Sequence, residues 1–551
     1  MDIEDLTVPP PSTARGEKEA LVLPKTRGAR FKPARGCGAA DAPAFLPETK
    51  RVYLKTFGCS HNASDSEYMA GLLAAEGYEV SVEAADAAAA DAWVINSCTV
   101  KDPSQAAFVR DAKKARDQGK AVVVAGCVVQ GDRKIVKAPA GDSKPPLLDG
   151  VSSIGIKQLG RVGEAVAAAL RGETFHALGA GPLPALDLPK RRLQELVEIV
   201  PLSTGCLGAC TYCKTRHARG KLGSYELEAI ADRAAAALDD GVAEIWLSSE
   251  DTGAYGIDLG TSLTKLLETL VPVLEARPWG TLRVGMTNPP YVRDQLDGLA
   301  VALRHPQVYA FLHVPVQSGS DNVLGRQGMN REYDVAHFRE VADGLRVRVP
   351  EVSLMTDIIC GFPGESENDF QETFDLVENY AFGLLNISQF YARPGTPAAK
   401  MRPRVPTATV KARSRRLTAL SATFRPYDGL VGSVKSCSSC AEIADGGRRL
   451  VAHTASYVKV LVAFDEALVG ARFDVEITAA HRWHVDGVVK RVTLAADVSK
   501  RPALRRALAR LRRGGDGFEA RKRAAAPRRF LAAWHCLAPL VLGVGVFYLW
   551  R

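Results

Sequence analysis

Between residues 49 and 178, short apolar runs alternate with stretches of helical period. The runs "RVYLKTFG", "DAWVINSC" and "KAVVVAGC" predict three buried strands, and "SDSEYMAGLLAAEGY" predicts a helix that stops at a glycine. Each strand leads to a cysteine: Cys59, Cys98 and Cys127. Because parallel strands end at the same edge of an open α/β sheet, the pattern predicts that these cysteines meet in space. Three buried structural thiols are the alternative interpretation.

Residues 195–425 alternate β-rich runs with helical patterns such as "SYELEAIADRAAAALDDG" and "DFQETFDLVENYAFG". The β-rich runs begin at residues 195, 244, 282, 308, 352 and 384. Six successive βα units predict an α/β fold in which a parallel sheet curls into a partial (βα)6 barrel. The reactive edge of such a barrel is formed by the carboxyl ends of its strands.

Residues 428–495 show frequent apolar–polar alternation and few helical periods, which predicts a small β-barrel. Cys437 and Cys440 form a C-x2-C in this region, but no second pair lies nearby, so the metal signal is weak. Residues 1–48 are rich in Pro, Gly, Ala and charged residues and predict a disordered tail. Residues 182–192 are interpreted as a linker because of their prolines.

The charge of the chain is concentrated near its end. The 551 residues carry a net charge of +9, and Lys500 to Arg529 holds twelve basic and two acidic residues. The remaining chain is therefore close to neutral, and its net charge alone does not indicate a nucleic-acid partner. We interpret residues 498–529 as a basic linker.

The segment that follows, residues 530–550, contains no Asp, Glu, Lys or Arg. About 20 apolar residues suffice for a helix that crosses a bilayer, and preceding basic residues favour the cytosolic side. No apolar run is present at the start of the chain that would resemble a signal peptide. We therefore expect a C-terminal transmembrane helix that anchors the protein in the endoplasmic reticulum membrane with its catalytic domains facing the cytosol. A buried C-terminal core helix is the alternative.

The most specific motif is C-x3-C-x2-C, formed by Cys206, Cys210 and Cys213 after the first barrel strand. Eleven cysteines, clustered in a chain of this length, favour metal binding in a reducing compartment over a disulfide framework. Three thiolates on one loop hold three corners of an iron–sulfur cube and leave one iron open for a cofactor. A zinc site with His217 as the fourth ligand is the alternative.

This motif in a βα series resembles the radical S-adenosylmethionine (SAM) enzymes. In that family the open iron chelates SAM, and reductive cleavage of SAM gives a 5′-deoxyadenosyl radical. Tyr212 lies between the last two cysteines, where its ring can pack over the cofactor.

The stretches "TFGCSHNASDSEYMAGLLAAEGY", "INSCTVKDPS" and "VVVAGCVVQ" are similar to the N-terminal domain of methylthiotransferases. "EIWLSSEDTGAYGID", "GMTNPPY", "FLHVPVQSGSD" and "NISQFYARPGTPAAKM" resemble the eukaryotic and archaeal branch of that family. The resemblance implies a second [4Fe–4S] cluster on Cys59, Cys98 and Cys127. It also implies that the enzyme adds a methylthio group at C2 of N6-threonylcarbamoyladenosine beside the anticodon of tRNA. An RNA-binding TRAM barrel and a membrane anchor are further family features that match residues 428–495 and 530–550.

The resemblance assigns catalytic roles to the six cysteines. The triplet Cys59, Cys98 and Cys127 would hold the sulfur to be transferred, and the other triplet would cleave SAM. The remaining cofactor-binding candidates end the second and fourth barrel strands: Glu250, Asp251, Gln317 and Ser318. A helix N-cap is the alternative for the first two. In "KTRHARG", Lys214, Arg216, His217 and Arg219 suit SAM carboxylate, RNA phosphate or a solvated loop equally.

The implied partners are tRNA, SAM, an electron donor, a sulfur donor and a membrane. Two other functions stay open at this point. One is methylthiolation of N6-isopentenyladenosine in tRNA, and the other is a non-catalytic, membrane-anchored redox or binding protein.

Overall fold

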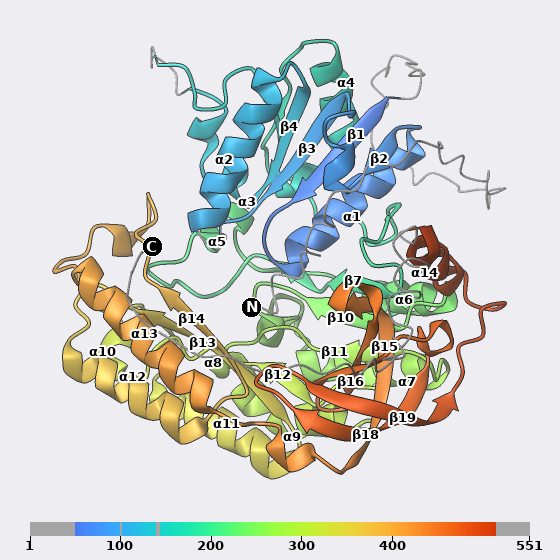
Figure 1. Cartoon of the computed structure of the whole chain (residues 1–551). Coiled ribbons are helices and arrows are strands. Elements are labelled where there is room, and N and C mark those ends of the chain that lie inside the picture. Colours follow the sequence, from blue (N-terminus) through green and yellow to red (C-terminus); the bar gives the residue numbers. More distant parts are fainter. Residues whose placement is uncertain (1–49, 100–101, 139–143, 514–551) are drawn as a thin grey trace, which may run out of the picture.

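The structure is a computed structural model that describes residues 50–99, 102–138 and 144–513. The predicted tail at 1–48 and the predicted anchor at 530–550 lie outside these residues. Figure 1 shows an N-terminal domain above a curved barrel, with a second, smaller barrel beside it at the lower right. The three predicted folding units are therefore present, and their relative placement defines the site.

The N-terminal domain is an open α/β sheet in which every strand pairing is parallel, in the order β2-β1-β3-β4-β5-β6. Its strands are β1 (Arg51–Thr56), β2 (Glu79–Ser81), β3 (Ala92–Ser97), β4 (Ala121–Gly126), β5 (Ser152–Ile154) and β6 (His176–Ala177). Its helices are α1 (Ser60–Ala75), α2 (Asp102–Asp117), α3 (Cys127–Gly131) and α4 (Val162–Leu170). β3 and β4 are buried along almost their whole length, which explains their near-continuous apolar sequences.

The barrel core consists of two parallel three-stranded sheets, β11-β10-β7 and β12-β13-β14. A parallel bridge between Leu282 and Val308 joins the two halves, so the predicted partial (βα)6 barrel is confirmed. Its strands are β7 (Val197–Pro201), β10 (Glu244–Ser248), β11 (Thr281–Arg283), β12 (Phe311–His313), β13 (Ser353–Cys360) and β14 (Leu384–Gln389). Its main helices are α6 (Leu227–Asp239), α7 (Leu263–Glu275), α8 (Pro289–Val292), α9 (Leu296–Leu303), α10 (Asp321–Leu324), α11 (Val335–Arg348), α12 (Glu367–Tyr380) and α13 (Thr407–Thr423).

The smaller barrel is closed, with strand order β15-β16-β17-β19-β18, as the alternating sequence predicts. The strands are β15 (Val434–Ala444), β16 (Arg449–Thr454), β17 (Lys459–Ala463), β18 (Arg472–Ala480) and β19 (Val485–Leu494). Arg472 Nη2 donates to Thr281 Oγ1 at the start of β11, and Tyr309 bonds both Ser438 of β15 and Glu244 at the start of β10. The small barrel therefore packs at the amino ends of the core strands. Cys437 and Cys440 are buried in the core, which fits packed thiols.

Helix α1 is the contact between the N-terminal domain and the core. It has buried residues around its whole circumference, including polar ones, because it lies between two packed surfaces. At Gly71 a Cβ would lie 2.2 Å from Pro189 O, so only glycine permits this approach. Residues 182–192, interpreted as a linker, contribute the fully buried Lys190 to this contact.

The segment after the small barrel differs from the sequence interpretation. Within the stretch assigned to a basic linker, Pro502–Arg513 forms α14, which buries Ala503, Leu504, Ala507 and Leu508. Arg506 of this helix pairs with Asp240 and Glu195 of the core. Apolar residues recur every three or four positions among the arginines. This spacing places them on one face of a helix, so the segment packs against the protein and is not a solvated linker.

Candidate active site at two cysteine triplets

The first triplet lies on a loop that two short strands close at its base. β8 (Ser203–Thr204) pairs antiparallel with β9 (Gly223–Ser224), and the cysteines lie between them. Gly205 opens the loop at φ +85°, where a Cβ would lie 2.1 Å from Lys221 O. A Cβ on Gly208 would lie 3.6 Å from Cys206 Sγ and 3.8 Å from Cys210 Sγ. The loop therefore curls so that the sulfurs of Cys206 and Cys210 border the same small space.

The second triplet comes together at the carboxyl edge of the N-terminal sheet. Cys59 precedes α1 after β1, Cys98 follows β3, and Cys127 begins α3 after β4. These three strands are neighbours in the sheet, so their ends meet at one place. Gly58 is close enough to Cys98 that any Cβ there would overlap its sulfur. The fold thus brings the three cysteines to one edge of the sheet, as the sequence predicted.

The spacing of the sulfurs argues against zinc. Among the residues that the structure describes, neither triplet has its three Sγ atoms within 4.8 Å of one another. A tetrahedral zinc with bonds of about 2.3 Å needs thiolates about 3.8 Å apart. His217 is exposed, so it is not poised as a fourth ligand. The nine cysteines in the described part of the chain are all free of disulfides, which leaves both triplets available to a larger polynuclear group.

Burial disfavours a bare thiolate at both triplets, and Arg219 supplies positive charge that offsets this at the second triplet. Burial raises the pKa of the Cys127 thiol to about 12, and the charge of Arg219 opposes this rise. Burial likewise raises the pKa of Cys206 to about 12, and the nearby Asp251 adds to the rise. Arg219 Nη1 is buried and donates no hydrogen bond to any described residue. A cluster bound through thiolates would supply the acceptor that this nitrogen lacks, so the donor set fits an iron–sulfur cluster.

Arg219 joins the two triplets. It ends α5 (Thr215–Arg219), the short helix after Cys213, and its side chain is 1% exposed. In Figure 1, α3 and α5 lie side by side between the domains, and Cys127 packs against Ala218. The sequence left a solvated loop or ligand contacts open for "KTRHARG". The structure buries Lys214 and Arg219, while Arg216 and His217 are exposed.

Glu250 and Asp251 follow β10 beside the first triplet; Asp251 is buried, and the Glu250 side chain is 9% exposed. Glu250 pairs with Arg219 Nε at 2.9 Å and accepts a hydrogen bond from the Gly205 N–H at 2.9 Å. Burial raises the pKa of Glu250 to about 7, and that of Asp251 to about 6. Asp251 also caps a short 3-10 helix through Gly253, which is the N-cap that the sequence offered as an alternative. Both carboxylates stay predictions as SAM contacts.

Two further residues contact this site and were not predicted from the sequence. Arg331 Nη1 donates to Cys210 Sγ and to the Tyr212 hydroxyl, both at 3.2 Å. Its Nη2 donates to the Asn288 side chain, whose own amide nitrogen donates to Asp251. The only sequence signal was the family stretch "GMTNPPY", which contains Asn288, because Arg331 lies more than a hundred residues from the cysteines it serves.

Gln317 and Ser318 follow β12, where the prediction placed them. Gln317 is buried, bridges to Ile358 of β13, and has φ +72°, an uncommon conformation for a residue other than glycine. The Ser318 hydroxyl contacts Thr373 of α12 and accepts from the Ser320 N–H. Ser318 is thus already engaged in packing, and a cofactor contact stays a prediction for both residues.

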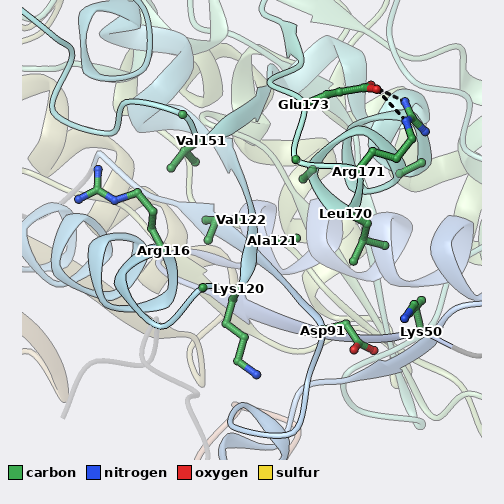
Figure 2. Close-up of a pocket in the computed structure, with 15 residues that line it drawn as sticks. Lys50, Asp91, Arg116, Lys120, Ala121, Val122, Val151, Leu170, Arg171 and Glu173 are labelled. Carbon is green, nitrogen blue, oxygen red and sulfur yellow. Dashed lines mark hydrogen bonds and ion pairs between the residues drawn. The ribbon is translucent and has the colours of Figure 1, made fainter.

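A cavity of about 500 Å³ opens elsewhere, at the amino ends of the N-terminal strands. Figure 2 shows Lys50, Asp91, Arg116, Lys120 and the Arg171–Glu173 ion pair around it. Open α/β folds bind their ligands at the carboxyl ends of the strands. This cavity is on the opposite edge from the cysteines and is not the reaction site.

Comparison with known proteins agrees with this geometry. Residues 51–143 match the model of "Uncharacterized protein family UPF0004", and residues 200–377 match the radical SAM superfamily. The chain is 46% identical over 506 residues to the threonylcarbamoyladenosine tRNA methylthiotransferase of Drosophila pseudoobscura pseudoobscura, covering 89% of this chain and 88% of that protein. It is 46% identical to the Homo sapiens protein of that name, covering 80% and 74%. A probable enzyme of that name from Pyrococcus horikoshii is 40% identical, covering 67% and 83%.

Proposed function

This chain belongs to the family of threonylcarbamoyladenosine tRNA methylthiotransferases, and we propose that its two cysteine triplets hold the two iron–sulfur clusters of the reaction. The enzyme adds a methylthio group to C2 of the adenine in N6-threonylcarbamoyladenosine of tRNA by radical SAM chemistry. Its cofactors are two [4Fe–4S] clusters and SAM. When bound, these groups supply the sulfur, its methyl group and the radical that activates C2.

The observation that carries the assignment is the meeting of the two triplets at one domain contact. Cys59, Cys98 and Cys127 present three sulfurs from the N-terminal sheet, and the loop of the first triplet presents three from the barrel mouth. Because α3 and α5 pack together, groups held by the two triplets face the same space. The chain therefore orients both reagents toward one base.

The other residues of the site hold the cysteine side chains in place and orient the cofactor. Arg331 fixes the Cys210 sulfur and the Tyr212 ring together, so the ring is kept beside the first triplet. Asp251 lies close enough to Cys206 for its charge to raise the pKa of that thiol. Its carboxylate is placed to pair with the ammonium group of SAM. The target base belongs to a single-stranded loop, so it can leave the stack and enter the site at small cost.

Nucleoside analysis tests the substrate. We expect that expression of this chain in cells lacking their own enzyme converts N6-threonylcarbamoyladenosine in tRNA to its 2-methylthio form. Mass spectrometry of digested tRNA measures both nucleosides, and the Cys206→Ala variant is the control without cleavage of SAM. A methylthio group on N6-isopentenyladenosine instead would assign the chain to the sister reaction. No methylthiolated nucleoside at all would favour a non-catalytic protein.

The apolar segment 530–550 is proposed to anchor the enzyme in the endoplasmic reticulum membrane, with its catalytic domains facing the cytosol. The support is its length and lack of charge, together with the basic residues before it. Within the described ranges, no helix has the length and apolar character needed to cross a membrane.

Carbonate extraction checks this proposal. The full chain should stay in the membrane pellet and sediment with markers of the endoplasmic reticulum, and a variant lacking 530–550 should be released. A variant lacking an equal number of residues from the N-terminal tail is the matched control and should stay in the pellet. Release of the full chain would show that the segment is not an anchor.

A further inference from the structure

Arg219 makes two hydrogen bonds and an ion pair that together span the domain contact. Its Nη2 donates to Asn62 Oδ1 at 2.8 Å and to Asp65 Oδ2 at 2.7 Å, both on α1, two turns or less from Cys59. Its Nε pairs with Glu250 Oε1 at 2.9 Å, at the end of β10 in the barrel. One side chain thus ties the N-terminal helix that follows Cys59 to the strand end that lines the first triplet.

The remaining nitrogen of Arg219 is the unusual feature. Nη1 is buried and meets no acceptor at hydrogen-bond geometry among the described residues, although a side-chain hydrogen bond from Arg219 opposes the rise that burial causes in the pKa of Cys127. A buried polar group left unsatisfied destabilises the fold, and more so when it is charged. Asn62 Oδ1, which accepts from Arg219 Nη2, also lies 3.6 Å from Cys127 Sγ, so the guanidinium lies at the second triplet. The Cys127 sulfur is the acceptor that the protein offers to this guanidinium, and a cluster bound through it would present further sulfurs.

We propose that Arg219 is a positioning residue whose Nη1 donates a hydrogen bond to the sulfur-bearing cluster held by Cys59, Cys98 and Cys127. The inference rests on the proposed function only in taking these cysteines as the cluster ligands. Because the same guanidinium also holds Glu250, it fixes the second cluster relative to the barrel mouth. A planar fork with five donors can bond Asn62, Asp65, Glu250 and a sulfur together, which a lysine ammonium cannot.

The proposal has an electronic consequence. Hydrogen bonds to cluster sulfurs and nearby charge set the reduction potential of an iron–sulfur cluster. Arg219→Gln removes one positive charge and leaves Asp65 and Glu250 facing the cluster uncompensated. Both changes stabilise the oxidised state, so the potential becomes more negative. Arg219→Lys keeps the charge but loses the hydrogen bond, which gives a smaller shift in the same direction.

The test uses the full chain with Cys206, Cys210 and Cys213 replaced by alanine, so that only the second cluster assembles. Its potential is measured by a titration followed with electron paramagnetic resonance, with arginine labelled with 15N to detect coupling between guanidinium and cluster. The expected result is a 15N coupling in the parent that is lost in both Arg219 variants, and a potential that falls in the order Arg, Lys, Gln. Arg413→Gln is the matched control, because Arg413 is equally buried and pairs with Glu365 and Glu367. It should lower stability and leave the coupling and the potential unchanged.

Each outcome decides the matter. A parent without 15N coupling, or an Arg219→Lys variant with unchanged coupling and potential, overturns the role of Arg219 while leaving the ligand assignment intact. If Arg219→Gln assembles no cluster, the coupling and the potential of Arg219→Lys, which retains the charge, decide the role of Arg219. A parent that assembles no paramagnetic cluster refutes the ligand assignment, and with it this inference.

Discussion

Alanine in place of Cys59, Cys98 or Cys127 should abolish methylthiolation of tRNA while the enzyme still cleaves SAM. These cysteines lie at the edge of the N-terminal sheet, whereas the loop that we propose binds SAM belongs entirely to the barrel domain. A cluster with two remaining thiolates loses a ligand that the fold cannot replace, since no strand of the described N-terminal sheet leads to a fourth cysteine. Mass spectrometry of tRNA nucleosides measures the product, and 5′-deoxyadenosine in the same reaction measures the cleavage of SAM.

Two controls sharpen this experiment. Alanine at Cys206, Cys210 or Cys213 should remove both activities, because cleavage of SAM depends on that triplet. Cys360→Ala should retain both, because Cys360 is a buried thiol that packs in the core and belongs to neither triplet. Methylthiolated product from a Cys59, Cys98 or Cys127 variant would show that the division of roles between the triplets is wrong.

Lys190→Met should lower the free energy of unfolding by about 3–5 kcal/mol, as expected when one partner of a buried ion pair is removed. Lys190 Nζ lies 3.1 Å from Glu67 and 2.8 Å from Glu198, and all three side chains are at most 2% exposed. Without the ammonium, Glu67 loses the cation that faces it in the domain contact, whereas Glu198 keeps its pairs with Arg192 and Arg233. Urea unfolding followed by circular dichroism measures the loss.

Lys265→Met is the matched control for this substitution. Lys265 pairs with Glu268 at 3.0 Å on the surface of α7, where both side chains are more than half exposed. Exposed pairs of this kind contribute about 0–1 kcal/mol, so the unfolding curve should barely move. Equal effects of the two substitutions would mean that the ion pairs of Lys190 with Glu67 and Glu198 do not stabilise the domain contact.

Most secondary structure could be predicted because local pattern and burial agree. The continuous apolar run at β4 and the Ser366 capping box at the start of α12 each specify their element without help from distant residues. The helix α14 was missed because its arginines dominate the composition, and their ion pairs become visible only once Asp240 and Glu195 are in place.

The candidate site divides in the same way. Cys206, Cys210 and Cys213 are close in the sequence, and their spacing alone predicts a shared ligand. Arg219 and Arg331 carry no such signal, because a basic residue in a loop is usually solvated. Their roles come from burial against Glu250 and Cys210, which lie on other elements.

The sequence by itself determined the three folding units, the two sets of cysteines and the family, because these depend on periodicity and short motifs. Only the tertiary structure decided that the sheet edge of one domain meets the barrel mouth of another, and that Arg219 is buried where they meet. The physical reason is that a buried charge is stable only beside partners such as Asp65 and Glu250, which are 154 and 31 residues away along the chain. No local pattern encodes such a pairing.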